Sequence, residues 1–140
     1  MRTIPELSYE EWEKDVPRHM RSDPRWTLRV YRTGLYAGEL GRQDSAFLAE
    51  RSSMGGVADQ LLRATGSISA NISEGYSRIA PRDRGKFWEY ALGSARESRD
   101  WYYKAREELG PDITNARLDL HTGICRVLTK LISNLRPHPR

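Results

Sequence analysis

The chain has 140 residues, of which 38% are hydrophobic and 30% are charged, a composition typical of a soluble domain with one core. Its net charge is +4, and its single cysteine, Cys125, excludes an intrachain disulfide and a cysteine cluster for metal. No apolar run approaches the roughly 20 residues that a membrane span needs, and the N-terminus lacks the apolar region of a signal peptide. We therefore expect a cytoplasmic, bacterial-type protein with no membrane association.

Residues 1–23 differ in charge from the rest of the chain. They hold four basic and six acidic side chains, a net charge of −2, so the remaining residues carry +6. Ser8-Tyr-Glu-Glu11 matches the capping-box pattern, which predicts a short helix from Ser8 to about Val16 that ends before Pro17.

Two helices are predicted in the first half of the remaining chain. Asp23-Pro24 combines an N-cap residue with proline at the first helical position, so the first long helix is expected from Pro24 to about Gln43, or as far as Leu48. A second helix is expected over residues 56–75, with Gly75 as its stop.

Two further helices are predicted in the second half. Pro81 suits the start of a third helix, whose apolar stripe runs from Phe87 to Leu109 before Gly110-Pro111 ends it. Asp112 is the expected cap of a fourth helix, which closes at Pro137. Short connections and one-sided apolar stripes predict an all-α, up-down-up-down four-helix bundle. The bundle domain would span residues 24–136, after a short N-terminal helical extension over 1–23 and before a frayed tail over 137–140.

The second helix has an unusual composition for a helix. On a wheel of about 100° per residue, one polar strip lies within about 40° of a single line: Arg63, Ser67, Asn71, Glu74 and Arg78. Many other positions are serine, alanine or glycine, and glycine costs about 1 kcal/mol relative to alanine inside a helix. We therefore expect other helices to approach this helix closely from more than one side, with the polar strip facing protein.

The polar strip has two interpretations: a ligand site, or a hydrogen-bonded network between helices or subunits. A buried Asn or Glu without a partner costs several kcal/mol, and the third helix offers partners, so we favour the network. The specific expectation is that Arg63 or Arg78 pairs with Glu97.

Residue patterns for catalysis or metal binding are not found in the sequence. A di-iron bundle needs Glu-x-x-His pairs, and none of His19, His121 and His138 follows a Glu by three positions. Cys125 lies on the apolar stripe of the fourth helix, which predicts a small buried side chain. We expect no metal, no cofactor and no enzyme activity.

Basic residues cluster where the second helix leads into the third, and others follow on the fourth helix. The expected phosphate contacts are Arg78, Arg82, Arg84, Lys86, Arg126 and Lys130, with Arg117 and Arg136 also on the fourth helix. Four tyrosines are available to stack on bases: Tyr76, Tyr90, Tyr102 and Tyr103. The alternative is a solvated charged surface with no ligand.

The segment from Gln60 to Arg78 contains the pattern Arg-Ala-x-x-Ser-Ile-x-x-Asn-Ile-x-Glu-Gly, and Phe87 and Ala91-Leu-Gly-Ser-Ala-Arg-Glu97 follow it. This combination resembles the bacterial four helix bundle proteins, which include proteins encoded by intervening sequences within 23S ribosomal RNA genes. It is also similar to the accessory variability determinant of diversity-generating retroelements. The resemblance covers roughly residues 24–135, and its signature falls on Arg63, Ser67, Asn71, Glu74 and Gly75.

The resemblance implies a homopentamer and a basic surface that binds nucleic acid and a reverse transcriptase. Two departures stand out: Ser73 replaces a common alanine, and Lys86 lies where the family often has an acidic residue. The acidic N-terminus is expected to shield part of the basic surface.

Two functional hypotheses follow. The first is a non-enzymatic, homo-oligomeric bundle that binds RNA or DNA with low sequence specificity. The second is a protein–protein interaction module for a partner encoded nearby, such as a reverse transcriptase, with no role in nucleic-acid binding.

Overall fold

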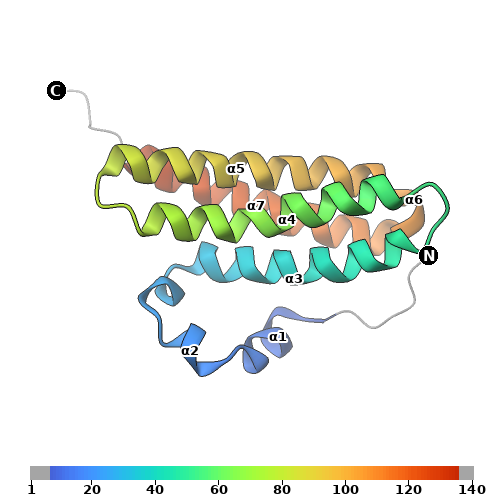
Figure 1. Cartoon of the computed structure of the whole chain (residues 1–140), viewed down its shortest axis with the longest axis horizontal. Coiled ribbons are helices and arrows are strands. Elements are labelled where there is room, and N and C mark those ends of the chain that lie inside the picture. The colour runs from blue at the N-terminus through green and yellow to red at the C-terminus, as the bar shows by residue number, and fades with distance from the viewer. Residues whose placement is uncertain (1–6, 136–140) are drawn as a thin grey trace.

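The structure, a computed structural model, describes residues 7–135, and the regular secondary structure over that range is all helical (Figure 1). The predicted all-α class is therefore confirmed. In chain order the elements are α1 (Tyr9–Asp15), α2 (Arg18–Arg21), the 3-10 helix η1 (Pro24–Thr27), α3 (Arg29–Ala49), α4 (Gly55–Tyr76), α5 (Pro81–Lys104), α6 (Arg106–Leu109) and α7 (Pro111–Leu135). The predicted tail over residues 137–140 and His138 lie outside the described residues.

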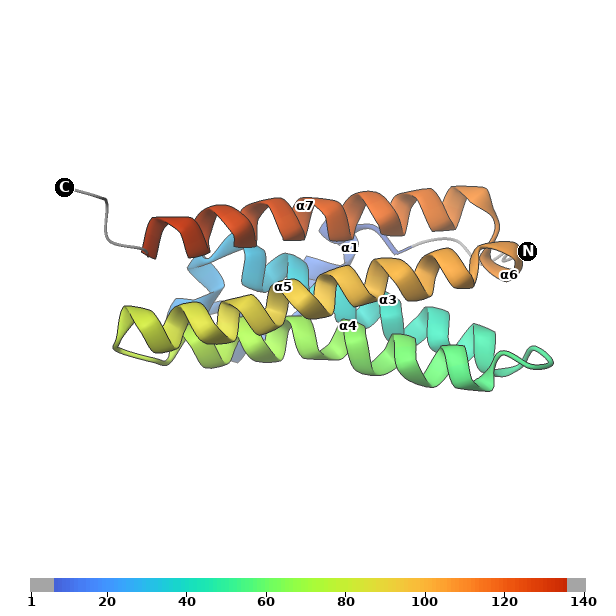
Figure 2. The same ribbon diagram turned by 90° about the horizontal axis from the view of Figure 1, so that it is seen from above.

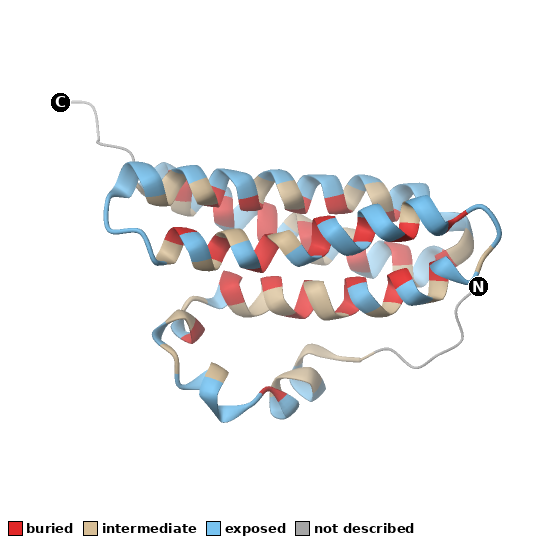
Figure 3. Cartoon of the chain, in the orientation of Figure 1, coloured by how far each residue is buried: buried red, intermediate tan, exposed pale blue. Residues whose placement is uncertain are grey.

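The four long helices α3, α4, α5 and α7 lie side by side, and each runs opposite in direction to the one before it (Figures 1 and 2). α4 packs against α3 and α5, and α5 packs against α7, whereas α3 and α7 meet less extensively. Buried residues follow the inward sides of these helices (Figure 3). None of the helices in residues 7–135 combines the length and apolarity needed to cross a membrane.

The helix at the N-terminus forms as the capping pattern predicts. The Ser8 hydroxyl accepts a hydrogen bond from the Glu11 amide at 3.2 Å, and the helix ends at Asp15, two residues before Pro17. The segment packs on the main core, in which Val16 is buried and against which Trp12 packs.

The first long helix begins five residues later than the sequence indicates. Asp23 does cap the chain, since its carboxylate accepts from the Arg25 amide at 2.9 Å. It caps only the 3-10 helix η1, however, and α3 starts at Arg29 and continues to Ala49. The turn places Trp26 against the core, which explains why an N-cap followed by proline does not open the long helix directly.

The second long helix also continues past its predicted stop. Gly75 is a buried residue within α4, which ends at Tyr76. The predicted third helix is divided, because α5 ends at Lys104 and a four-residue helix, α6, precedes the turn at Gly110. Gly110 has a φ of 84°, a left-handed conformation that favours glycine, and α7 then begins at Pro111, so Asp112 lies in its first turn and is not its cap.

Candidate functional site

The corner between α4 and α5 is closed by a tryptophan that lies directly against a glycine. A Cβ atom added to Gly75 would lie 2.5 Å from Cδ1 of Trp88, closer than any real side chain allows. The Trp88 indole nitrogen donates to the Ile72 carbonyl at 3.1 Å. Gly75 is thus required for close approach and not as a helix stop. Sequence reasoning assigned the apolar position to the neighbouring Phe87, which is only half-buried.

Arg84 holds the same corner together. Its guanidinium donates to the carbonyls of Gly75 and Tyr76, both at 3.2 Å, and to that of Arg78 at 2.9 Å. These carbonyls lie at the end of α4 and just beyond it, where the helical amides run out, and the Gly75 carbonyl also accepts from the Arg78 amide at 3.1 Å. Arg84 therefore acts as a cap, and the structure gives it a structural role besides its predicted contact with phosphate.

The expected ion pair between α4 and Glu97 is wrong. Arg63 pairs with Asp59 at 3.4 Å within α4, and Arg78, two residues beyond the end of α4, pairs with Glu74 at 2.5 Å. Glu97 is exposed and accepts a hydrogen bond from the Trp101 indole at 3.2 Å. Carboxylates four residues earlier in the chain reach these arginines more easily than a carboxylate on α5 does.

The rest of the polar strip is only partly enclosed within the chain. The Ser67 hydroxyl donates to the Ser94 hydroxyl on α5 at 2.6 Å, and the Asn71 amide donates to the Ser67 carbonyl at 2.9 Å. Arg63, Glu74 and Arg78 are exposed, as are Gly66 and Ala70 on the outer side of α4. Close packing from several sides, expected for this helix, is found on the sides of α3 and α5 only.

Ser73, one of the two departures from the family pattern noted in the sequence, has a hydrogen-bond partner for its hydroxyl. Arg25, in η1, donates to it at 2.5 Å and is itself held by Asp23 at 2.9 Å. The pair links the N-terminal segment to α4, 48 residues further along the chain.

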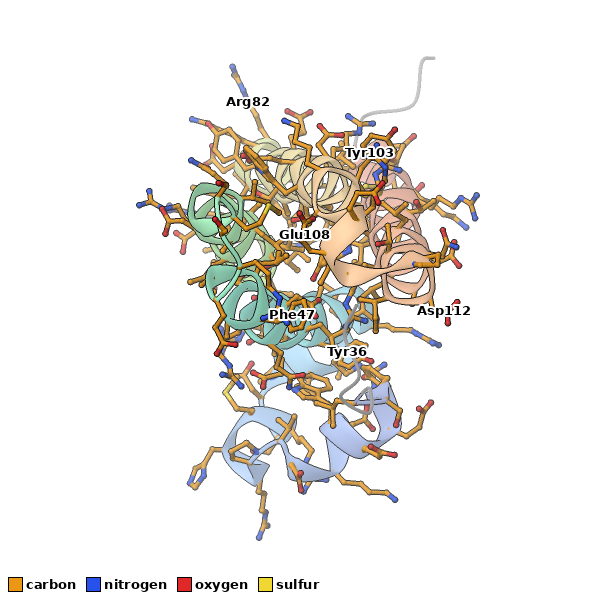
Figure 4. The ribbon with its side chains drawn as sticks, turned by 90° about the vertical axis from the view of Figure 1, so that its right-hand side faces the viewer. Tyr36, Phe47, Arg82, Tyr103, Glu108 and Asp112 are labelled. Carbon is orange, nitrogen blue, oxygen red and sulfur yellow. The ribbon has the colours of Figure 1, made fainter. Side chains whose placement is uncertain are left out.

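Two of the predicted phosphate contacts lie at the start of α5. Arg82 and Lys86 are exposed and have no ion-pair partner among the described residues. Arg82 extends away from the helices at the top of Figure 4. Both border an open groove of about 930 Å³, which is also lined by Pro81, Asp83, Gly85, Glu89, Ile132 and Leu135.

The remaining predicted contacts lie on α7, which packs beside α5. Arg126 and Lys130 are exposed, one helical turn apart, and unpaired within residues 7–135. Sequence reasoning did not include Arg96 of α5 in this set, although it too is exposed and unpaired in that range. We call Arg82, Lys86, Arg96, Arg126 and Lys130 the basic residues of α5 and α7.

Arg117, by contrast, is not on the surface. Only 2% of its side chain is exposed, and its guanidinium donates to the Asp44 carboxylate at 2.6 Å. The Tyr102 hydroxyl donates to the same carboxylate at 2.7 Å, so Tyr102 is not available to stack on a base. The tyrosines with exposed rings are Tyr90 and Tyr103, at 50% and 55%.

His121 completes this buried polar cluster. Its Nδ1 lies 2.8 Å from the Arg117 carbonyl, and its Nε2 is buried without a hydrogen-bond partner. Burial lowers the pKa of His121 to about 4, so the ring is neutral near pH 7. We name Asp44, Tyr102, Arg117 and His121 the buried cluster. It joins α3, α5 and α7 and was not predicted from the sequence.

Cys125 is buried, as its place on the apolar stripe predicts. Burial raises the pKa of its thiol, which keeps it protonated and unreactive near neutral pH. Across residues 7–135, no three His, Cys, Asp or Glu side chains are grouped closely enough to hold a metal ion.

The acidic N-terminal helix does not cover the basic residues of α5. In Figures 1 and 4, α1 lies along α3, on the opposite side of the molecule from α5. Aromatic contacts hold it there, with the rings of Tyr9 and Trp12 5.4 Å and 5.5 Å from that of Tyr36. The shielding expected from the sequence therefore does not occur at α5 within one chain.

Comparison with known proteins identifies similar sequences and folds. The sequence profile of the 23S rRNA-intervening sequence proteins matches residues 45–130, more than half of the chain. A crystal structure of a protein of unknown function from the S23 ribosomal protein family of Bacteroides thetaiotaomicron has a TM-score of 0.71 and 23% sequence identity. The similarity covers 74% of this chain and 97% of that one, and it shows a shared fold. No curated protein matches the chain.

Proposed function

The chain belongs to the family of 23S rRNA-intervening sequence proteins, and from this premise we propose that it is a non-enzymatic, cytoplasmic protein that binds RNA or DNA with low sequence specificity. The observation that carries the proposal is the set of five exposed cations on α5 and α7, none of which has an ion-pair partner within residues 7–135. Such side chains contact phosphates without first breaking an internal pair, and they release counterions when they do so.

The proposed contacts do not contribute equally to phosphate binding. Arg82, Lys86, Arg126 and Lys130 are free to bind phosphate, and Arg96 joins them. Arg78 is bonded to Glu74 and Arg84 to three carbonyls, so each contributes positive potential and not a new direct bond. Backbone phosphates carry no sequence information, which is why low specificity is part of the proposal.

We also propose that α3, α4, α5 and α7 form an up-down-up-down four-helix bundle that assembles into a homopentamer. The family resemblance implies the number five. Support for an assembly comes from α4, whose outer side carries Gly66 in open space. A mid-helix glycine there costs about 1 kcal/mol relative to alanine, and contact with a neighbouring helix would offset this cost.

The test compares two double variants in binding to a mixed-sequence RNA labelled with fluorescein. Arg82→Gln/Lys86→Gln removes two of the proposed phosphate contacts. Arg18→Gln/Arg21→Gln removes two exposed cations from α2, on the opposite side of the molecule, and is the matched control. The first pair should reduce the slope of log K against log salt by about 2, while the control leaves it unchanged. Equal slopes for the wild type and both variants would refute the proposed surface.

The second candidate is an interaction module for a protein encoded nearby, such as a reverse transcriptase. The bare outer side of α4 favours it, because Leu62, at 44% exposure, is an apolar side chain near Gly66 that a partner helix would cover. Co-purification of a stoichiometric partner without nucleic-acid absorbance would support this candidate over the first.

A further inference from the structure

Ile79 is the most exposed large hydrophobic residue of the described chain. It lies in the turn between α4 and α5, and 97% of it is open to solvent, against 44–55% for the four other large hydrophobics that are exposed. Single exposed apolar residues are common on proteins and need no special explanation. The surroundings of Ile79, however, differ from those of an ordinary surface position in two respects.

The first is that the turn is held in one shape. Arg84 bonds the carbonyls of Tyr76 and Arg78 just before Ile79, and the Arg84 amide donates to the Ala80 carbonyl at 3.0 Å just after it. Pro81 then fixes the start of α5. A side chain presented by an ordered turn loses little conformational entropy when it becomes buried in a complex.

The second is that cationic residues flank it in the sequence, although Arg78 is paired with Glu74. Arg78 precedes Ile79 directly, and its guanidinium lies 4.8 Å from the centre of the Phe87 ring. Arg82 follows three residues later, and Lys86 lies one turn further along α5, both exposed. An apolar tip between arginine and lysine side chains is the chemistry by which proteins insert a wedge between stacked bases while contacting the neighbouring phosphates.

We propose that Ile79 is a wedge that enters between two adjacent unpaired bases of a single-stranded or bulged RNA. Arg82 and Lys86 bind the phosphates on either side. The proposal rests on the nucleic-acid function argued above and specifies its substrate class. Unpaired bases are favoured because separating them costs less than separating bases within a duplex.

An anionic membrane is the other surface that attracts an apolar tip among cations. Even a myristoyl chain, with far more carbon than isoleucine, gives only marginal and reversible membrane binding. One isoleucine therefore supplies too little insertion energy to hold the protein on a bilayer, and the single strand is the better match.

The experiment uses a single-stranded RNA that carries 2-aminopurine at one internal position, whose fluorescence rises when its neighbours unstack. Wild-type protein should bind with a rise in fluorescence. Ile79→Ala should bind about three- to tenfold more weakly, and its binding should no longer raise the 2-aminopurine fluorescence. The slope of log K against log salt should stay unchanged. Val127→Ala, which shortens another exposed aliphatic side chain, on α7, is the matched control and should behave as wild type. Quenching in place of a rise would indicate stacking on Tyr90 or Tyr103 and would overturn the wedge.

The outcomes separate the two proposals. If Ile79→Ala keeps both affinity and fluorescence rise, the wedge is refuted while the salt-dependent contact with phosphates stands. If the wild type shows no salt-dependent binding to the RNA, the nucleic-acid function itself fails, and the wedge with it. Ile79-dependent binding to phosphatidylserine vesicles in place of RNA, or a lower assembly mass for Ile79→Ala by light scattering, would also overturn the wedge.

Discussion

Asp44 and Arg117 form a buried ion pair between residues 73 positions apart in the chain. Their side chains are 0% and 2% exposed, and the hydrogen bond from Arg117 Nε to Asp44 Oδ2 measures 2.6 Å. Both charges are desolvated, so each depends on the other for compensation. The Tyr102 hydroxyl adds a bond to the same carboxylate and brings α5 into contact with α3 and α7.

Asp44→Ala should lower the free energy of unfolding by about 3–5 kcal/mol, because it leaves the Arg117 guanidinium buried without its partner. Glu39→Ala, which breaks an ion pair between Glu39 and the exposed Arg42, is the control and should cost about 1 kcal/mol or less. Urea unfolding measures both. Equal losses for the two variants would mean that the buried cluster does not stabilise the fold as described.

His121 should make stability depend on pH. Burial lowers its pKa from the ordinary value of 6.5 to about 4. The unfolded chain therefore binds the proton first, and stability present above pH 6.5 is lost as the pH falls toward 4. The full loss is on the order of 3 kcal/mol. In His121→Leu this part of the acid dependence should disappear from unfolding curves recorded between pH 7 and 4; an unchanged dependence would show that other groups cause it.

At the scale of elements, the junction of α4 and α5 determines how the basic residues at the start of α5 are displayed. Trp88 packs on Gly75 and bonds the Ile72 carbonyl, while Arg84 caps the end of α4. These contacts fix the turn that carries Ile79 and the first residues of α5. The junction thus links the family signature at Gly75 to the proposed binding surface.

Gly75→Ala should destabilise the protein by about 1–3 kcal/mol, because the new methyl group overlaps the Trp88 ring. Gly93→Ala is the matched control: a Cβ at Gly93 meets nothing within 4 Å, so alanine should be neutral or stabilise α5 by up to about 1 kcal/mol. Thermal unfolding followed by circular dichroism compares them. A Gly75→Ala variant as stable as Gly93→Ala would contradict the close packing at the corner.

The helices themselves were largely predictable, because capping residues and apolar periodicity are local signals. Ser8 and the stripe of α7 gave correct elements within a few residues. The contacts between elements were not predictable in the same way. Arg117 looked like a surface cation because its partner, Asp44, lies 73 residues away.

The candidate site was only partly predictable for the same reason. A helical wheel gives the direction of Arg63 and Arg78 but not the competition from Asp59 and Glu74, which pair with them first. The burial of Trp88 depends on the space at Gly75 across the corner, and no pattern within α5 reveals it.

At the scale of the whole molecule, the N-terminal segment and α5 lie on opposite sides. The segment packs along α3, whereas Arg82 extends outward from α5 (Figures 1 and 4). α3 is therefore partly covered by its own chain, and the outer side of α4 is left bare. An assembly that uses α4 would leave α5 and α7 open to a ligand.

Light scattering should give the mass of an assembly and not the 16.1 kDa of one chain; a pentamer would have five times that mass, about 80 kDa. Gly66→Leu should lower the mass, since leucine blocks close approach to α4, while a Cβ at this position meets nothing within 4 Å inside the chain. Gly123→Leu, at another open glycine on α7, is the control and should keep the wild-type mass. A monomeric wild type, or equal masses for all three proteins, would refute assembly through α4.

The salt dependence of RNA binding by nuclease-treated wild-type protein tests the central claim most directly. Fluorescence anisotropy with a mixed-sequence RNA should show tight binding at 50 mM salt that weakens steeply by 200 mM. Four to five phosphate contacts predict a loss of roughly 50-fold to 500-fold over that range. Affinity that is absent at 50 mM salt, or that does not change with salt, would contradict the account.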